Sequence, residues 1–86
     1  MADDPAATET IASLRCRIDE IDTALIQLWQ ERAELSQQVC VLRQSAGGTR
    51  LSLSREYEVL KRFRGAIGAN GAQLGLLLVR AGRGPL

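Results

Sequence analysis

A heptad pattern in the first half of the chain limits the possible folds more than any other sequence feature. From residue 11 onward, apolar residues recur at alternating steps of three and four, which is the spacing of a seam between packed helices. The pattern predicts a helix from about residue 8 to residue 45, with Asp4, Thr8 or Thr10 as its cap and SAGG at 45 to 48 as its end. The seam positions are Ile11, Leu14, Ile18, Ile21, Leu25, Leu28, Arg32, Leu35, Val39 and Leu42.

Such a helix is too long for the rest of the chain to cover. At 1.5 Å per residue it is about 55 Å long, whereas a compact domain of this length has a radius of gyration near 12 Å. The roughly 40 residues that follow cannot shield the whole apolar seam. We therefore expect an intertwined homodimer, in which two long helices pack along each other and each chain completes the cover of its partner.

The second half of the chain predicts two shorter helices. Ser52 or Ser54 is expected to cap the first of them, which ends near the glycines at 65 and 68. ANG at 69 to 71 begins the other, whose segment QLGLLLVR is apolar on almost every side and should be buried from several directions. AGRGPL then closes the chain with helix-breaking Gly and Pro.

These elements define the expected fold class. The composition is rich in Leu, Ala, Arg, Glu and Gln and poor in aromatic residues, which favours helices over sheet. We expect an all-α protein with one long helix and two shorter ones, a flexible N-terminus at residues 1–7 and a single domain at residues 8–86. Cys16, Cys40 and Trp29 are expected to be packing residues, and the cysteines lie about 36 Å apart on one helix, too far for a disulfide.

Composition and charge exclude several classes of function. The sequence has no histidine, which is the commonest general base and a frequent zinc ligand, and no CxxC, P-loop or GxGxxG motif. A net charge of +1 argues against a nucleic-acid partner, and the longest apolar run is far shorter than the roughly 20 residues of a membrane span. We expect no metal, cofactor, nucleic acid or membrane partner. The acidic N-terminus does not resemble a signal peptide, so a cytoplasmic location is expected.

One seam position carries a charge. Arg32 brings about five donors and a permanent charge to a helix-helix seam, which is unfavourable unless an anion faces it. Arg43 lies eleven residues further on, within about 20° of the same helix face. Arg55 and Glu56 follow the turn, and an antiparallel partner helix would bring its own Arg15 close. Several arginines together suit a small polyanion, because each guanidinium can grip a carboxylate through two hydrogen bonds.

Spacing alone leaves structural interpretations open. A polar residue at one seam position can serve only to set the register of two helices. Arg32 can also form a structural ion pair with Glu31, Glu34 or a carboxylate of a partner chain. Glu56 can be an acidic residue that interacts favourably with the dipole at a helix start.

The motifs then indicate a family. The form LRxxIDxIDxxLIxLxxxRAELxxxVxxxR at 14 to 43, followed by GGTRL at 47 to 51 and SREYEVLKR at 54 to 62, resembles the all-helical chorismate mutases. The GGTRL turn and the GRG near the C-terminus are most similar to a short actinobacterial subgroup, and the match covers about residues 11 to 84. The resemblance implies an intertwined dimer with two equivalent sites, each completed by an arginine of the other chain.

The resemblance also implies roles for individual residues. Arg15 would be the arginine donated across the dimer. Arg32 and Arg55 would grip the two carboxylates of the substrate. Arg43 would reach a carboxylate and the ether oxygen, and Glu56 would accept a hydrogen bond from the substrate hydroxyl.

Two positions depart from the relatives. Ser52 stands where some relatives have an aspartate, which puts a second contact to the substrate hydroxyl in question. Arg83 falls at about the place where some relatives have a glutamine against the ether oxygen. We expect Arg83 to assist Arg43 there.

The implied reaction is the rearrangement of chorismate to prephenate, which needs no nucleophile, metal or cofactor. Three alternatives are an isochorismate-pyruvate lyase of the same fold, a 4-amino-4-deoxychorismate mutase, and a helical dimerisation or regulatory module without a substrate. The resembling subgroup is activated by docking on DAHP synthase while its C-terminal segment rearranges. DAHP synthase is therefore an expected partner.

Overall fold

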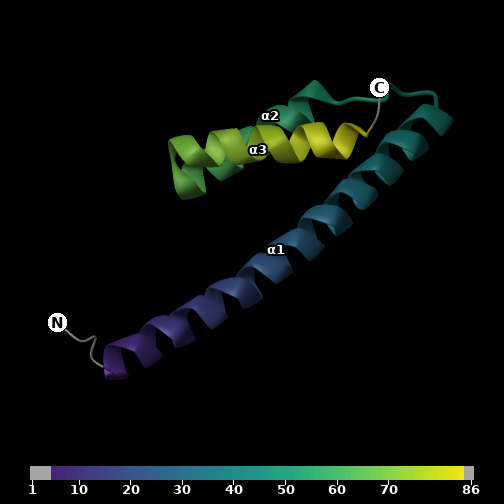
Figure 1. Cartoon of the computed structure of the whole chain (residues 1–86). Coiled ribbons are helices and arrows are strands. Elements are labelled where there is room, and N and C mark those ends of the chain that lie inside the picture. The colour runs from purple at the N-terminus through teal and green to yellow at the C-terminus, as the bar shows by residue number, and fades with distance from the viewer. Residues whose placement is uncertain (1–4, 85–86) are drawn as a thin grey trace.

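The protein is all-helical over residues 5–84, the part of the chain that the computed structural model describes. Three helices follow one another in this part: α1 at Pro5–Ser45, α2 at Leu53–Ile67 and α3 at Ala69–Arg83 (Figure 1). No strand occurs among these residues. The expected fold class of one long helix and two shorter ones is confirmed.

Helix α1 has nearly the predicted bounds. It ends at Ser45 as expected and begins at Pro5, three residues earlier than predicted. Proline suits the first turn of a helix, where its missing N–H leaves no hydrogen bond unmade. The predicted cap Asp4 and the rest of residues 1–4 lie outside the described residues.

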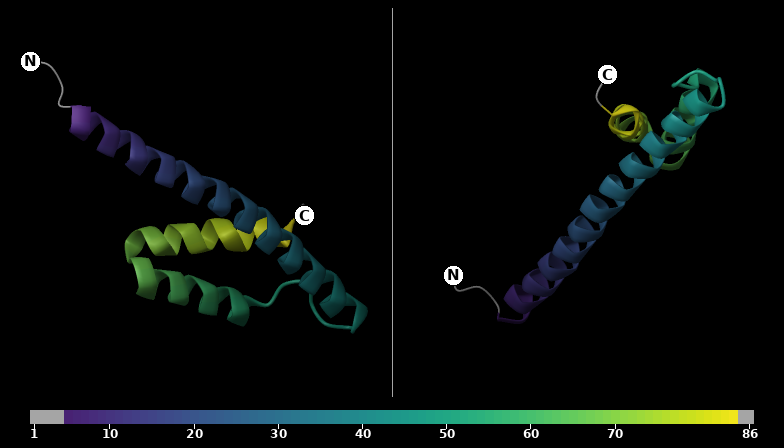
Figure 2. Two further views of the ribbon diagram at one scale, coloured as in Figure 1. Left: turned by 90° about the horizontal axis from the view of Figure 1, so that it is seen from below. Right: turned by 90° about the vertical axis from the view of Figure 1, so that its right-hand side faces the viewer.

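Helices α2 and α3 form an antiparallel hairpin (Figure 2). Ser52 caps α2 by accepting a hydrogen bond from the Arg55 backbone N–H, as predicted. Gly68 has φ of 92° and both ends α2 and begins α3, in a conformation that L side chains rarely adopt. A Cβ at Gly71 would overlap the carbonyl oxygen of Phe63, so glycine allows α3 to approach α2 closely.

The small core lies where α3 crosses the other helices. Its buried apolar side chains are Val59 of α2 and Leu78 and Val79 of α3. Helix α3 packs against both α1 and α2, whereas α1 and α2 do not pack on each other. A Cβ at Gly82 would overlap the side chain of Ser36, so this glycine sets the distance between α3 and α1.

One expectation for α3 is wrong. The helix does not end before AGRGPL but continues to Arg83, with Gly84 as its cap, because Gly82 packs closely against α1. Helix α3 packs against two helices and buries Leu78 and Val79, so QLGLLLVR is buried from more than one direction, as expected, whereas Leu76 is 37% and Leu77 is 51% exposed.

The hairpin covers only the C-terminal half of α1 (Figure 2). The radius of gyration is 18.8 Å, against about 12 Å for a compact chain of this length. The accessible surface of 7043 Å² exceeds the roughly 5,000 Å² of a compact protein of this mass. All nine apolar seam residues of α1 are between 42% and 68% exposed. The apolar seam therefore has no cover within one chain.

Candidate active site

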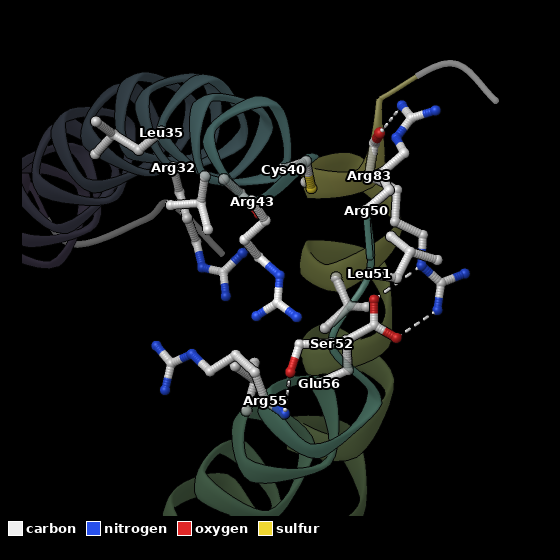
Figure 3. A pocket seen from close by; sticks show the side chains of 15 residues that line it. Arg32, Leu35, Cys40, Arg43, Arg50, Leu51, Ser52, Arg55, Glu56 and Arg83 are labelled. Atoms are coloured by element: carbon white, nitrogen blue, oxygen red, sulfur yellow. Dashed lines mark hydrogen bonds and ion pairs between the residues drawn. The ribbon is translucent and has the colours of Figure 1, made fainter. Parts of the chain in front are cut away.

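A pocket of about 290 Å³ lies between α1 and the α2–α3 hairpin (Figure 3). The C-terminal half of α1 forms one wall, and the start of α2 and the end of α3 form the opposite side. The 50–52 segment closes the pocket between them. The lining residues are Arg32, Leu35, Ser36, Val39, Cys40, Arg43, Arg50, Leu51, Ser52, Arg55, Glu56, Val59, Val79, Gly82 and Arg83.

The pocket is strongly positive. The lining residues that the structure describes include five arginines and one glutamate, a formal excess of four positive charges, whereas the whole chain carries only +1. The guanidiniums of Arg32 and Arg43 point from α1 toward Arg55 on α2 (Figure 3). Arg50 and Arg83 lie on the other side of the pocket, beside the end of α3. Such a concentration of positive charge favours an anionic ligand.

Arg32 has no acidic partner among the side chains that the structure describes. Its Nη1 donates to the backbone oxygen of Leu78 at 3.3 Å, and it takes part in none of the ion pairs. Partial burial and the nearby charge of Arg55 lower the pKa of Arg32, because both disfavour its charged form. The ion pair with Glu31 or Glu34 that the sequence left open is therefore not formed within the chain.

The turn after α1 holds Arg43. The Nε of Arg43 donates to the Thr49 carbonyl oxygen at 3.1 Å, and its Nη2 donates to Thr49 Oγ1 at 3.4 Å. The hydroxyl of Thr49 in turn donates to the Leu51 carbonyl oxygen at 2.8 Å. These contacts link the orientation of Arg43 to the conformation of the turn.

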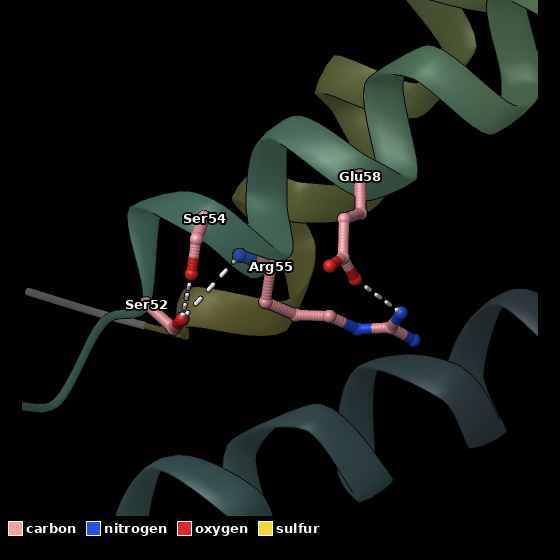
Figure 4. A network of polar contacts seen from close by, with 4 residues as sticks. All are labelled: Ser52, Ser54, Arg55 and Glu58. Atoms are coloured by element: carbon pink, nitrogen blue, oxygen red, sulfur yellow. Dashed lines mark hydrogen bonds and ion pairs between the residues drawn. The ribbon is translucent and has the colours of Figure 1, made fainter.

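The first turn of α2 orients Arg55 (Figure 4). Ser52 Oγ accepts from the backbone N–H of Arg55 at 3.4 Å and lies 3.3 Å from Ser54 Oγ. The Arg55 guanidinium contacts Glu58 at 3.4 Å, but both side chains are more than 60% exposed. An exposed pair of this kind contributes little, so it holds Arg55 only weakly against an anionic ligand.

Glu56 and Arg83 form the shortest and least exposed ion pair among the described residues. Arg83 Nε donates to Oε2 at 2.9 Å and Nη2 donates to Oε1 at 2.7 Å, a bidentate arrangement across α2 and α3. The pair is mostly shielded, with side-chain exposures of 28% for Arg83 and 17% for Glu56. These hydrogen bonds hold the pKa of Glu56 below its ordinary value, although burial alone would raise it. They also raise the pKa of Arg83.

The structure brings six of the seven predicted site residues together in this pocket; they are Arg32, Arg43, Ser52, Arg55, Glu56 and Arg83. The remaining one, Arg15, is exposed on the N-terminal half of α1 and does not line it.

Sequence reasoning missed Arg50. Its Nη2 donates to the Arg83 carbonyl oxygen at 2.6 Å. Its place in GGTRL, directly before the cap of α2, was the available signal.

The cysteines and the tryptophan differ from one another. Cys40 lines the pocket, whereas Cys16 is exposed, and neither forms a disulfide, as expected. Trp29 is 37% exposed, so neither it nor Cys16 is fully packed within the single chain.

Among residues 5–84, no group of acidic or cysteine side chains is arranged to hold a metal ion. None of the three helices has a stretch long and apolar enough to cross a bilayer.

The fold and the site together define a class of protein. The domain is helical, and its arginine-lined pocket suits a small dianion. A nucleophile–histidine pair cannot form, because the chain has no histidine. Such a pocket can hold a flexible dianion in one conformation and stabilise negative charge that develops within it.

Comparisons with known proteins agree with this class. The chorismate mutase type II family matches residues 14–77. The intracellular chorismate mutase of Mycolicibacterium smegmatis is 44% identical over 80 residues, which are 93% of this chain and 77% of the relative. That of Mycobacterium tuberculosis is 42% identical over 76 residues, or 88% and 71% of the two chains.

A solved structure is also similar. It is a non-covalent complex of DAHP synthase and chorismate mutase from Corynebacterium glutamicum with a bound transition state analog. The matching chain superposes with a TM-score of 0.87 at 35% identity, over 95% of this chain and 99% of the other.

The chain belongs to the chorismate mutase type II family. It is therefore an isomerase of the chorismate mutase class. The family match ends at residue 77, so Arg83 and the end of α3 lie beyond it.

Proposed function

We propose that this pocket rearranges chorismate to prephenate by restraining the substrate and stabilising charge on its ether oxygen. The observation that carries the proposal is the convergence of Arg32, Arg43 and Arg55 in a pocket where Glu56 is the one acidic residue among the described lining residues. The rearrangement is unimolecular and needs no nucleophile. Holding the reacting carbons close and placing positive charge at the breaking C–O bond are sufficient.

The three converging arginines divide two tasks. Arg32 and Arg55 bind the two carboxylates, since neither guanidinium is held by a buried carboxylate of its own. Arg43 faces the ether oxygen, because the turn already orients its guanidinium through Thr49. A donor fixed before the reaction stabilises developing charge without reorganisation.

Glu56 accepts a hydrogen bond from the substrate hydroxyl in this proposal. Its depressed pKa keeps the carboxylate ionised and able to accept. Arg83 orients this carboxylate through its two hydrogen bonds. A direct contact of Arg83 with the ether oxygen stays a prediction, since both of these donors face Glu56. Ser52 supports Arg55 as the cap of α2, and its contact with substrate also stays a prediction.

A homodimer completes the site. The exposed seam of α1 needs a long apolar partner, and a second α1 has the matching heptad spacing. An antiparallel α1 of the partner would carry its Arg15 toward Arg32 and close the open side of the pocket. Two uncovered helices of this length favour a large intertwined interface over a small contact.

The proposal also includes a second protein as a partner. The similar Corynebacterium glutamicum structure is a complex with DAHP synthase, and we propose that this chain docks on the same kind of enzyme. The relatives are named intracellular chorismate mutases, which supports a cytoplasmic location.

A substrate panel tests the proposed function. Purified protein is incubated with chorismate, isochorismate or 4-amino-4-deoxychorismate, with and without DAHP synthase, and the products are identified by chromatography. We expect prephenate from chorismate and faster turnover with DAHP synthase. Salicylate and pyruvate from isochorismate would instead indicate a lyase. If no substrate were converted, with or without DAHP synthase, the result would favour the alternative of a helical dimerisation or regulatory module without a substrate.

A variant locates the chemistry. Arg43→Gln removes the donor assigned to the ether oxygen and should lower kcat by about 100- to 1,000-fold. Arg64→Gln is the matched control, because Arg64 is exposed on α2 and does not line the pocket. Equal activity of the two variants would contradict the assignment of Arg43.

A further inference from the structure

The end of α3 is held by a side chain from the turn between α1 and α2. Arg83 is the last residue of α3, and its carbonyl oxygen is one of the four at a helix C-terminus that have no partner within the helix. Arg50 Nη2 donates to this oxygen at 2.6 Å, a short contact between partly buried groups. The positive charge of Arg50 also complements the negative end of the α3 dipole.

The contact continues into the pocket. Arg50 holds the backbone of Arg83, and the side chain of the same residue grips both oxygens of Glu56. A shift of the Arg83 backbone would therefore move the guanidinium that orients the carboxylate. The preceding part of α3 is held independently, since Gln37 donates to the Ala81 carbonyl oxygen at 3.3 Å. Loss of Arg50 would consequently loosen the last residue and leave the rest of α3 in place.

Arg50 lies apart from the arginines that converge on the ligand space. Figure 3 shows its side chain beside the end of α3, whereas Arg32 and Arg43 point toward Arg55. Its hydrogen bond to Arg83 is to protein backbone. This geometry fits a residue that acts through another residue better than a fifth direct ligand of the substrate.

We propose that Arg50 is a positioning residue, which holds the end of α3 so that Arg83 presents Glu56 to the substrate. The inference deepens the proposed function and rests on it for the role of Glu56. It assigns the GGTRL turn a task in the active site beyond connecting two helices. The same turn then controls two site residues, Arg43 through Thr49 and Glu56 through Arg50.

A double-mutant cycle tests whether Arg50 acts through Arg83. Arg50→Gln alone should lower kcat/KM by about tenfold, the effect of losing one hydrogen bond with a charged donor. In the Arg83→Gln background the same change should have less than about a twofold effect, because the link is already broken. Arg50→Lys, which keeps the charge, should recover part of the loss. A tenfold loss in both backgrounds would show direct contact with substrate and overturn the proposal.

A second measurement does not depend on turnover. The side-chain carboxyl of Glu56 is titrated by carbon NMR in wild type, Arg50→Gln and Arg80→Gln proteins. We expect the pKa of Glu56 to rise in Arg50→Gln and to stay unchanged in Arg80→Gln, an exposed control on α3. An unchanged pKa in Arg50→Gln would overturn the proposed link, even if the protein converted no chorismate. Absence of turnover with a raised pKa would contradict only the proposed function.

Discussion

Replacing Arg32 by leucine separates a ligand-binding arginine from a structural one. Leucine restores the apolar heptad pattern between Leu28 and Leu35, so a purely structural view of the seam predicts a better interface. The proposed function predicts a folded protein with severely reduced activity. The two views therefore differ in the activity that they predict for this variant.

The structural loss from this replacement is small. Arg32 donates to the Leu78 carbonyl oxygen over 3.3 Å and has no described acidic partner, so about 1 kcal/mol of stability is at stake. Burial and the nearby charge of Arg55 both disfavour the charged form of Arg32, as its lowered pKa indicates. Removing this charge therefore offsets part of the loss. We expect an unchanged or higher melting temperature at fixed protein concentration.

The loss of activity is large. A bidentate contact between a guanidinium and a substrate carboxylate contributes about 3 kcal/mol, which corresponds to roughly a 150-fold fall in kcat/KM. The assay is chorismate depletion, beside thermal unfolding and sedimentation of the same samples. Arg17→Leu is the control on the same helix, since Arg17 pairs only with exposed Glu20 in the described structure. Full activity of Arg32→Leu would refute the reasoning, whether its melting temperature rises or falls.

Three further perturbations test other parts of the molecule. Arg83→Gln removes the hydrogen bonds that lower the pKa of Glu56, whereas the burial that raises this pKa remains. The acid limb of the pH profile of kcat/KM should therefore move to higher pH. An acid limb that does not move would exclude this pair from catalysis. In wild type the pair should stabilise the fold above the unfolded-state pKa of Glu56 and lose this effect as pH falls through the lower folded-state value. Gly82→Ala should overlap Ser36, destabilise the protein by about 1 to 3 kcal/mol and lower its melting temperature; an unchanged melting temperature would contradict this packing. Leu28→Glu places a charge in the exposed seam and should yield monomers in sedimentation equilibrium, whereas a stable dimer would move the interface elsewhere.

Helix α1 was predictable because its signal is local and repeated. Steps of three and four persist over more than four heptads, with no Gly or Pro between residues 11 and 42. The end of α3 was not predictable in the same way. Gly82 locally disfavours a helix, but its missing side chain allows close packing on Ser36, and this tertiary contact outweighs the local preference.

The candidate site also combines contacts that local sequence spacing predicts with contacts that depend on tertiary packing. Arg32 and Arg43 share a face of one predicted helix, so their proximity follows from helical geometry. Arg50 contacts a backbone oxygen, which carries no sequence signal, and its partner lies 33 residues away. Glu56 and Arg83 are 27 residues apart on different helices, and their pairing depends on how the hairpin closes.

The sequence by itself determined the long helix, its uncovered apolar seam and a charged residue within it that needs an anion. Periodicity is a property of the chain and needs no knowledge of distant contacts. Only the tertiary structure decided which carboxylate Arg83 holds, that Arg50 contacts the end of α3, and that Arg32 has no acidic partner among the described side chains. Those facts depend on how α3 packs against both α1 and α2, which brings groups far apart in the chain within hydrogen-bond distance.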